Sequence, residues 1–259
     1  MASRDALLSV RSLNVSFAGA QARIDAVRDV SFDAHSGEVL AIIGESGSGK
    51  STLARALIGM VQPTSGTIRL DGAAIAASAR RRPRAVRRRI GMVFQDSGGA
   101  FDPRFSVRRI LLEPLLLLGD AAPAEREASI ERLLDDVGLS LSLADRLPHE
   151  LSGGQRQRLG IARALASSPD LLICDEAVSA LDVSVQAQIL NLLDELQTRR
   201  RLTLIFITHD LGVVEYLADR IGVMHRGRLV EIGPAPQILN DPRHSYTRGM
   251  LTLAAPPAE

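Results

Sequence analysis

The chain has 259 residues, of which 46% are hydrophobic, and its formal net charge is +1 at neutral pH. This composition supplies the core of one α/β domain, and the near-neutral balance excludes a strong general attraction to nucleic acid. The chain has no run of about 18 apolar residues, no apolar N-terminal segment and no second cysteine beside Cys174, so we expect no membrane span, no secretory signal and no internal disulfide.

Three short segments near the N-terminus predict an antiparallel β layer. Polar and apolar residues alternate over residues 13–17, 30–32 and 67–70, which is the pattern of a strand buried on one face. The third segment ends at Asp71-Gly72, a turn signal. These strands are expected to flank the first fully buried strand, residues 39–43, which is a continuous apolar run.

A phosphate-binding loop follows that buried strand. Residues 44–51 fit the pattern G-x-x-x-x-G-K-[ST], and helical spacing of apolar residues over 51–60 completes the strand, loop and helix that the motif requires. Lys50 is the sole lysine among 31 basic residues, and a compact ammonium suits the gap between two phosphates better than a planar guanidinium does. The alternative, a chance glycine turn before an ordinary helix, does not explain this context.

The loop predicts a nucleotide triphosphate as ligand. Glycines let backbone N–H groups surround the phosphates, and the helix N-terminus adds a positive dipole end. Ser51 offers its hydroxyl to Mg²⁺. The candidate nucleotide-binding residues of the loop are Gly44, Glu45, Ser46, Gly47, Ser48, Gly49, Lys50, Ser51 and Thr52.

An arginine-rich segment precedes the next predicted strand, residues 90–94. Seven of the ten residues 80–89 are arginine. This run has two interpretations: a patch for nucleic acid or lipid headgroups, or a solvated connector. We favour the connector, because the overall charge is near zero and aromatic residues make up only 3% of the chain.

The rest of the chain alternates helices and strands. Residues 106–166 have helical patterns, among them a helix through Ile130 to Val137 that ends near Gly138. Residues 171–174 and 204–208 are two further buried strands, with a helix over 185–196 between them. This order predicts a mostly parallel sheet covered on both faces. We expect one domain over 1–259, with a helical subdomain over about 96–166 and a C-terminal extension over about 233–259.

Two carboxylates stand at the end of a predicted buried strand. Asp175 and Glu176 follow four apolar residues, and ligands of open α/β sheets bind at this edge. Asp175 is expected to hold magnesium, and Glu176 to orient or deprotonate a water for attack on the γ-phosphate. Either acid alone would read as a helix cap. Cys174, just before them, is interpreted as a small buried hydrophobe.

A serine-glycine turn precedes another predicted helix, residues 156–166. Ser152 can cap this helix, and the two glycines after it let an anion approach the backbone closely. Taken alone, this is only a capped helix. Its position about twenty residues before Asp175 and Glu176 is what indicates a functional role.

In this order of motifs the chain resembles the ATP-binding cassette (ABC) ATPases along nearly its whole length. The motifs are the phosphate loop, Gln95 after a strand, Leu-Ser-Gly-Gly-Gln at 151–155, the Asp-Glu pair, Ser-Ala-Leu-Asp at 179–182 and His209. The resemblance implies a RecA-like P-loop core with a mostly parallel sheet, an antiparallel β subdomain and an inserted α-helical subdomain. It implies ATP and Mg²⁺ as cofactors.

The resemblance also assigns roles to individual residues. Phe17 stacks on adenine, Gln95 contacts the metal and the attacking water, and His209 stabilises the γ-phosphate. Asp182 helps to join two cassettes. The implied catalytic residues are thus Glu176, His209, Lys50 and Gln95, and the implied metal ligands are Ser51, Gln95 and Asp175.

In this family the turn formed by residues 151–155, called the signature turn, completes the nucleotide site of a second cassette. Ser152, Gly153, Gly154 and Gln155 then contact ATP that is held by the partner's phosphate loop. Two ATP molecules are sandwiched between two chains, so a lone monomer is expected to bind ATP but to hydrolyse it poorly. Every motif is intact, and we expect this chain to serve both sites of a dimer.

Further features resemble the oligopeptide, dipeptide and nickel importer ATPases. They are Phe-Gln-Asp at 94–96 with Phe-Asp-Pro-Arg at 101–104, the run of residues 175–188, and His-Ser-Tyr-Thr at 244–247. Serine replaces an expected proline at Ser97 and at Ser245. The cysteine-rich iron–sulfur site of some relatives cannot form with Cys174 alone.

The resemblance implies the ATPase subunit of a peptide importer, held at the cytoplasmic face of a bacterial inner membrane. The implied partners are a second ATPase subunit, two permeases that dock beside Gln95 and residues 101–104, and indirectly a solute-binding protein; no nucleic acid is expected. Transport of nickel or another solute, or export, remains open. A soluble cassette ATPase of DNA repair or translation is the other alternative, but the chain has neither a long coiled coil nor a second cassette.

Overall fold

The computed structural model describes residues 6–18, 23–95, 99–118, 122–179 and 181–254. The chain forms two compact units, one made of Met1–Arg82 with Thr203–Glu259 and one of Pro83–Leu202. Each unit is described by itself. Among the described residues, none of the helices combines the length and the apolar character that crossing a membrane requires.

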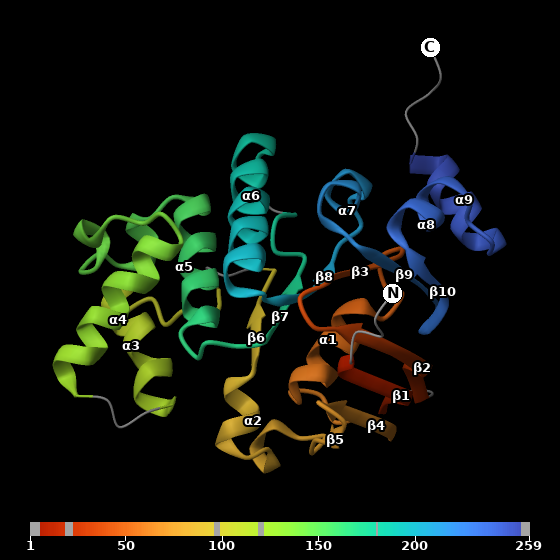
Figure 1. The fold of residues 1–259 in the computed structure, drawn as a ribbon, viewed down its shortest axis with the longest axis horizontal. Coiled ribbons are helices and arrows are strands. Elements are labelled where there is room, and N and C mark those ends of the chain that lie inside the picture. The colour runs from red at the N-terminus through yellow and green to blue at the C-terminus, as the bar shows by residue number, and fades with distance from the viewer. Residues whose placement is uncertain (1–5, 19–22, 96–98, 119–121, 180, 255–259) are drawn as a thin grey trace. The chain divides into compact units, whose positions relative to one another are not determined.

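The first unit contains the predicted antiparallel layer (Figure 1). Strand β1 (Ala6–Ala18) pairs antiparallel with β2 (Arg23–His35) and with β4 (Ser65–Leu70), and β5 (Ala73–Ala74) extends the sheet beyond β4. The buried side chains of β1 are Leu7, Leu8, Val10, Leu13 and Val15. The break in their alternation between Val10 and Leu13 coincides with a register shift and a positive φ of 44° at Ser12, so one extra residue is accommodated as a bulge.

Buried parallel strands form the second layer of this unit. Strand β3 (Val39–Ile43) pairs parallel with β8 (Thr203–Ile207) and with β9 (Arg220–His225). All residues of β3 and β8 are buried, as their continuous apolar sequences predict. Strand β10 (Arg228–Pro234) pairs antiparallel with β9.

The hairpin of β9 and β10 has no counterpart among the sequence-based predictions. Its two-residue turn is Arg226-Gly227, and both residues have positive φ, 47° and 82°. Such turns favour Asn-Gly or Asp-Gly. Arginine in the first position removes the usual signal, which explains why the pattern was missed.

Helices of the first unit pack on the parallel strands. They are α1 (Lys50–Ile58), α7 (Leu211–Leu217), α8 (Ala235–Asn240) and α9 (Ser245–Ala254), while the short turn η1 (Ala79–Arg81) is hydrogen-bonded to Gly59 after α1. One core cluster joins Ile43 of β3 and Val223 of β9 to Val214 of α7 and Ile238 of α8, with Tyr246 of α9 packed against it. The C-terminal residues that follow β10 therefore pack against the same core as the phosphate-loop strand.

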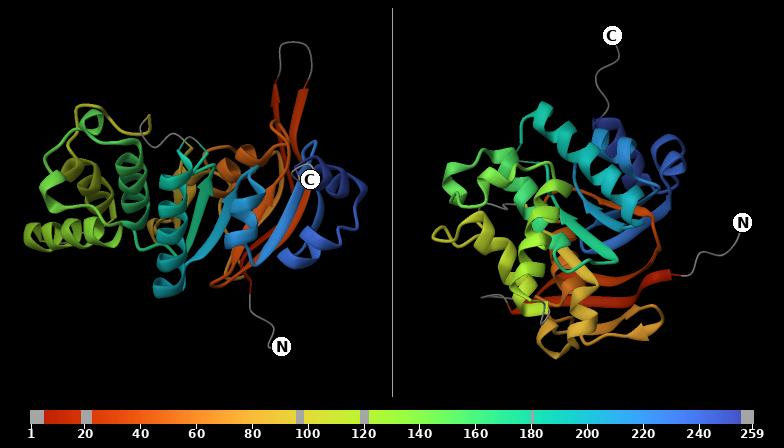
Figure 2. Two further views of the ribbon diagram at one scale, coloured as in Figure 1. Left: turned by 90° about the horizontal axis from the view of Figure 1, so that it is seen from above. Right: turned by 60° about the vertical axis from the view of Figure 1, so that its left-hand side comes forward.

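The second unit contains two strands and the inserted helices (Figure 1, Figure 2). Strands β6 (Ile90–Val93) and β7 (Leu171–Asp175) pair parallel. Helices α3 (Val107–Leu118), α4 (Pro123–Asp136) and α5 (Gly153–Leu165) contact one another, with short turns η2 (Leu141–Leu143) and η3 (Pro148–Glu150) between the last two. Helices α2 (Arg84–Arg88) and α6 (Val183–Arg200) complete the unit. The helical region predicted over 106–166 is confirmed.

The arginine-rich segment contributes two structural side chains. Arg82, in the first unit, is buried and donates to the carbonyl oxygens of Ala76 and Leu57, each at 2.7 Å. Burial lowers the pKa of Arg82 to about 10, so its guanidinium stays charged at neutral pH. Arg89, in the second unit, forms an ion pair with Asp170. The exposed members of the run are Arg80, Arg81, Arg84, Arg87 and Arg88.

Candidate nucleotide site

The phosphate loop wraps around the ammonium group of Lys50. Lys50 is only 5% exposed, and its Nζ donates to the carbonyl oxygens of Gly44 at 2.7 Å and Glu45 at 2.9 Å. Helix α1 begins at Lys50, and its cap residue, Gly49, makes no side-chain cap hydrogen bond. An uncapped helix N-terminus beside a buried cation is a site suited to an anion.

Neighbouring strands pack directly against this loop. Gly44 has a φ of 148°, and a Cβ there would lie 2.1 Å from the carbonyl oxygen of Met224 in β9. A Cβ at Gly49 would lie 2.2 Å from the carbonyl oxygen of Ala26 in β2. The Gly227 N–H of the β9–β10 turn donates to the Ser48 carbonyl at 2.9 Å. Only glycine permits this packing, which leaves a backbone cradle of the kind that a triphosphate requires.

The other candidates of the first unit lie on loops and strand ends. Glu45, Ser46 and Gly47 form the exposed part of the loop. Phe17, near the end of β1, is 42% exposed, so its ring is accessible for the predicted stacking on adenine. His209 follows β8 and is exposed.

In the second unit, Gln95 and Glu176 meet. Asp175 ends β7 and is buried, and Glu176 follows with a φ of 49°, an uncommon value for a residue other than glycine. The Gln95 Nε2 donates to the Glu176 Oε2 at 2.8 Å. Val93 of β6 pairs with Cys174 of β7, so the carboxyl ends of both strands lie side by side. This register explains why the two side chains are in contact.

The thiol of Cys174 lies inside the core, in β7. Cys174 is fully buried, as predicted, and burial raises the pKa of its thiol to about 12. The protonated thiol therefore acts as an apolar side chain next to Asp175.

The signature turn forms a capping box on α5. The Ser152 Oγ accepts from the Gln155 N–H at 3.2 Å, and the Gln155 side chain accepts from the Ser152 N–H at 2.9 Å. Ser152 and Gly153 are exposed. A serine hydroxyl that accepts one hydrogen bond still carries a proton that it can donate. The turn can therefore contact an anion while the hydrogen bonds that cap α5 stay in place.

The residues after β7 pack against this turn. Asp182 caps α6, accepting from the Val185 N–H at 2.9 Å and the Ser184 hydroxyl at 2.8 Å. The hydrogen bond from the Val185 N–H, with that from Ser184, holds the pKa of Asp182 below its usual value. Asp182 thus has a structural role within the subunit. Ala180 of the same motif, and residues 96–98 after Gln95, lie outside the described residues.

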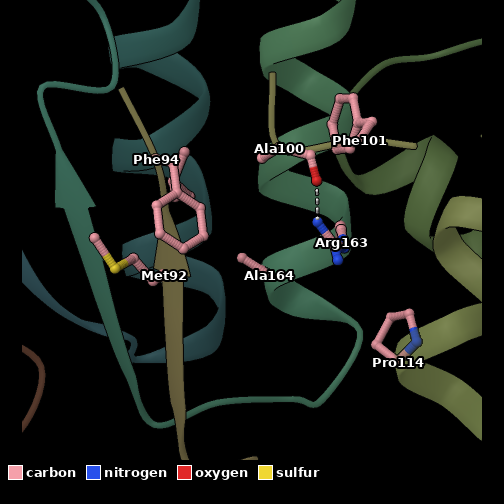
Figure 3. Close-up of a pocket in the computed structure, with 9 residues that line it drawn as sticks. Met92, Phe94, Ala100, Phe101, Pro114, Arg163 and Ala164 are labelled. Atoms are coloured by element: carbon pink, nitrogen blue, oxygen red, sulfur yellow. Dashed lines mark hydrogen bonds between the residues drawn. The ribbon is translucent and has the colours of Figure 1, made fainter. Parts of the chain in front are cut away.

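A cavity of about 180 Å³ in the second unit is lined in part by Phe94, the residue before Gln95 in the chain (Figure 3). It was not predicted from the sequence. Arg163 of α5 donates to the Ala100 carbonyl at 3.1 Å and stands over the Phe101 ring at 5.9 Å from its centroid. The residues that line the cavity are Met92, Val93, Phe94, Ala100, Phe101, Pro114, Gly160, Arg163 and Ala164.

A family model described as ABC transporter matches residues 27–179, which is more than half of the chain. The chain belongs to the ABC transporter family. A "Putative peptide import ATP-binding protein" of Brucella ovis is 45% identical over 251 residues, covering 97% of this cassette and 79% of the relative. The "Oligopeptide transport ATP-binding protein OppF" of Bacillus subtilis is 44% identical over 248 residues, covering 95% and 81%.

Solved cassettes have the same fold. The post-hydrolysis dimer of the ATP-binding cassette MJ0796, bound to ADP and Pi, is 28% identical with a TM-score of 0.78, covering 88% of this cassette and 98% of that chain. Another is cbiO1 from Clostridium perfringens, 31% identical with a TM-score of 0.79 and 92% coverage of both chains. These findings confirm the predicted ATPase class, the predicted α/β fold and the resemblance to the peptide importer ATPases.

The donor set of the cassette is compatible with Mg²⁺. The described residues contain no group of three or more histidine, cysteine or acidic side chains that could enclose a metal ion. Mg²⁺ is usually bound through one or two carboxylates, waters and the phosphates of a substrate. The single predicted carboxylate, Asp175, together with the hydroxyl of Ser51, fits that preference.

We predict that the two signature glycines differ in their tolerance of alanine. A Cβ at Gly154 would lie 2.7 Å from Val185 Cγ1, whereas a Cβ at Gly153 would meet Leu181 Cδ2 at an ordinary 3.8 Å. Overpacking of this kind costs about 1–3 kcal/mol. Gly154→Ala should therefore lower the free energy of unfolding by about that amount relative to Gly153→Ala. Denaturant unfolding of both variants checks this, and equal stabilities would contradict it.

Proposed function

We propose that this cassette is the ATP-hydrolysing subunit of a bacterial importer, with peptides as the cargo. The observation that carries this proposal is the 45% identity over 97% of the chain to a protein named for peptide import. The complete set of nucleotide motifs supports hydrolysis as well as binding. Residues 1–259 act as a single cassette domain in this proposal.

The phosphate loop binds and orients the nucleotide. Lys50 supplies a positive charge to the β- and γ-phosphates, and the N-terminus of α1 adds its partial charge. Phe17 stacks on adenine. Ser51, Gln95 and Asp175 hold Mg²⁺, which when bound neutralises charge that develops on the phosphates. The contribution of these groups is positioning and electrostatic stabilisation.

Glu176 is the general base. Its carboxylate accepts a proton from the water that attacks the γ-phosphate. The hydrogen bond from Gln95 Nε2 to Glu176 Oε2, at 2.8 Å, orients that carboxylate. His209 stabilises the γ-phosphate. A change in Gln95 therefore alters the base directly, which links the loop after β6 to hydrolysis.

A second cassette completes each site. The exposed Ser152 and Gly153 present the N-terminus of α5 to the γ-phosphate that the partner cassette holds. ATP binding closes the pair, and hydrolysis reopens it. The partner is a copy of this chain or a similar cassette.

Permeases dock at the cavity of the second unit that Arg163 also lines. Its mainly apolar lining, with Phe94 and Phe101, suits the insertion of a short apolar element of a permease. The cassette is then held at the cytoplasmic face of the inner membrane by two permeases. A solute-binding protein joins the system indirectly, and nucleic acid has no role.

Affinity capture from solubilised bacterial membranes tests the proposal. The tagged cassette is expected to copurify with two permeases, a second ATPase subunit and a solute-binding protein. Uptake of a labelled peptide should fail in cells that carry Glu176→Gln and continue in cells that carry Glu195→Gln, a matched change at an exposed position of α6. Capture of ribosomes or DNA in place of permeases would contradict transport. Loss of nickel uptake with normal peptide uptake in the Glu176→Gln cells would contradict the assignment of peptides as the cargo.

A further inference from the structure

A tyrosine near the C-terminus contacts the phosphate loop. Tyr246 lies in α9, and its hydroxyl accepts from the backbone N–H of Glu45 at 3.4 Å. Burial raises the pKa of Tyr246; the hydrogen bond from the Glu45 N–H lowers it, and the negative charge of Glu45 raises it. The Tyr246 hydroxyl therefore contacts the backbone of Glu45.

Glu45 in turn holds the nucleotide lysine. Its carbonyl oxygen accepts from Lys50 Nζ at 2.9 Å. Two hydrogen bonds thus connect Tyr246 to Lys50 through Glu45. Tyr246 and Glu45 are 201 positions apart in the chain, and Glu45 and Lys50 are five apart. Because Glu45 itself is exposed, this contact restrains a part of the loop that would otherwise be anchored chiefly through its neighbours.

The tyrosine is itself fixed by the β9–β10 hairpin. Its ring lies 3.8 Å, centroid to centroid, from that of His225 at the end of β9. Glu231 of β10 accepts from the backbone N–H groups of Arg243 at 2.8 Å and His244 at 3.1 Å, and His244 Nδ1 accepts from the Tyr246 N–H at 3.1 Å. The position of Tyr246 is therefore set by contacts within the protein.

We infer that Tyr246 is a positioning residue for ATP binding, acting through Glu45 on the phosphate loop and on Lys50. The His-Ser-Tyr-Thr segment at 244–247 thereby belongs to the nucleotide site. The inference rests on the proposed binding of ATP to this loop and goes beyond it. A single hydrogen bond to a neutral group changes an equilibrium constant by about two- to tenfold.

Tyr246→Phe tests this inference, because it removes the hydroxyl and keeps the ring on His225. The matched control is Tyr216→Phe, since Tyr216 is the other tyrosine of the chain and is exposed in α7. Tyr246→Phe should raise the Kd for a fluorescent ATP analogue, and the KM for ATP, by about two- to tenfold. We expect kcat to stay within a factor of about two, because the loss falls on ground-state and transition-state binding alike.

Two further measurements separate positioning from a general structural role. The Glu45 amide should exchange with solvent faster in Tyr246→Phe than in Tyr216→Phe, and the melting temperatures of the two variants should agree. Unchanged Kd and KM in Tyr246→Phe would overturn the inference, as would an equal rise in Tyr216→Phe or a loss confined to kcat. Failure of the wild-type protein to bind ATP would refute the proposed function instead.

Discussion

Replacing Glu176 by glutamine is expected to slow ATP hydrolysis by about 10²–10⁴-fold, the usual contribution of a general base. The amide cannot accept the proton of the attacking water. Its oxygen can still accept the hydrogen bond that Gln95 Nε2 donates to Glu176 at 2.8 Å, so the geometry at the end of β7 is retained. Steady-state phosphate release measures the effect.

The same variant reports on the nucleotide sandwich. With hydrolysis blocked, ATP should bind with unchanged affinity and should shift Glu176→Gln from monomer to dimer in light scattering. Glu195→Gln is the control, because it makes the same chemical change at an exposed position in α6. Turnover within a factor of two of the wild type would show that the base is wrongly assigned. A Glu176→Gln protein that stays monomeric with ATP would contradict the two-chain site.

Replacing Lys50 by alanine is expected to reduce hydrolysis by about 10²–10³-fold or more, the cost of removing one positioned donor from such a site. Unlike Glu176→Gln, this change should also abolish measurable ATP binding. Lys50 Nζ is buried between the carbonyl oxygens of Gly44 and Glu45, at 2.7 and 2.9 Å, so its loss removes the charge and leaves both carbonyls without that donor.

Lys50→Arg is also expected to lose ATP binding and hydrolysis. The planar guanidinium cannot occupy the space of a compact ammonium between two backbone carbonyls. Equilibrium binding of ATP and phosphate release should be measured on Glu176→Gln, Lys50→Ala and Lys50→Arg, with circular dichroism as the test of folding. A folded Lys50→Ala protein that binds ATP within a factor of two of the wild type would refute the role assigned to the loop.

Local pattern was sufficient to predict most of the fold. Continuous apolar runs predict β3, β7 and β8 because strands buried on both faces exclude polar side chains. The helices of residues 106–166 follow from apolar periodicity. The β9–β10 hairpin was missed because Arg226 occupies a turn position where asparagine or aspartate is the usual signal.

Residue chemistry and motif order alone thus determined that this protein is a cassette ATPase with a phosphate loop, an acidic pair and a signature turn. Tertiary structure decided which side chains meet. Gln95 and Glu176 are 81 positions apart and touch because β6 and β7 pair in parallel, and Tyr246 reaches Glu45 across 201 positions because α9 packs on the β3–β9 core. Such contacts depend on the register and packing of elements distant in the chain, which no local spacing records.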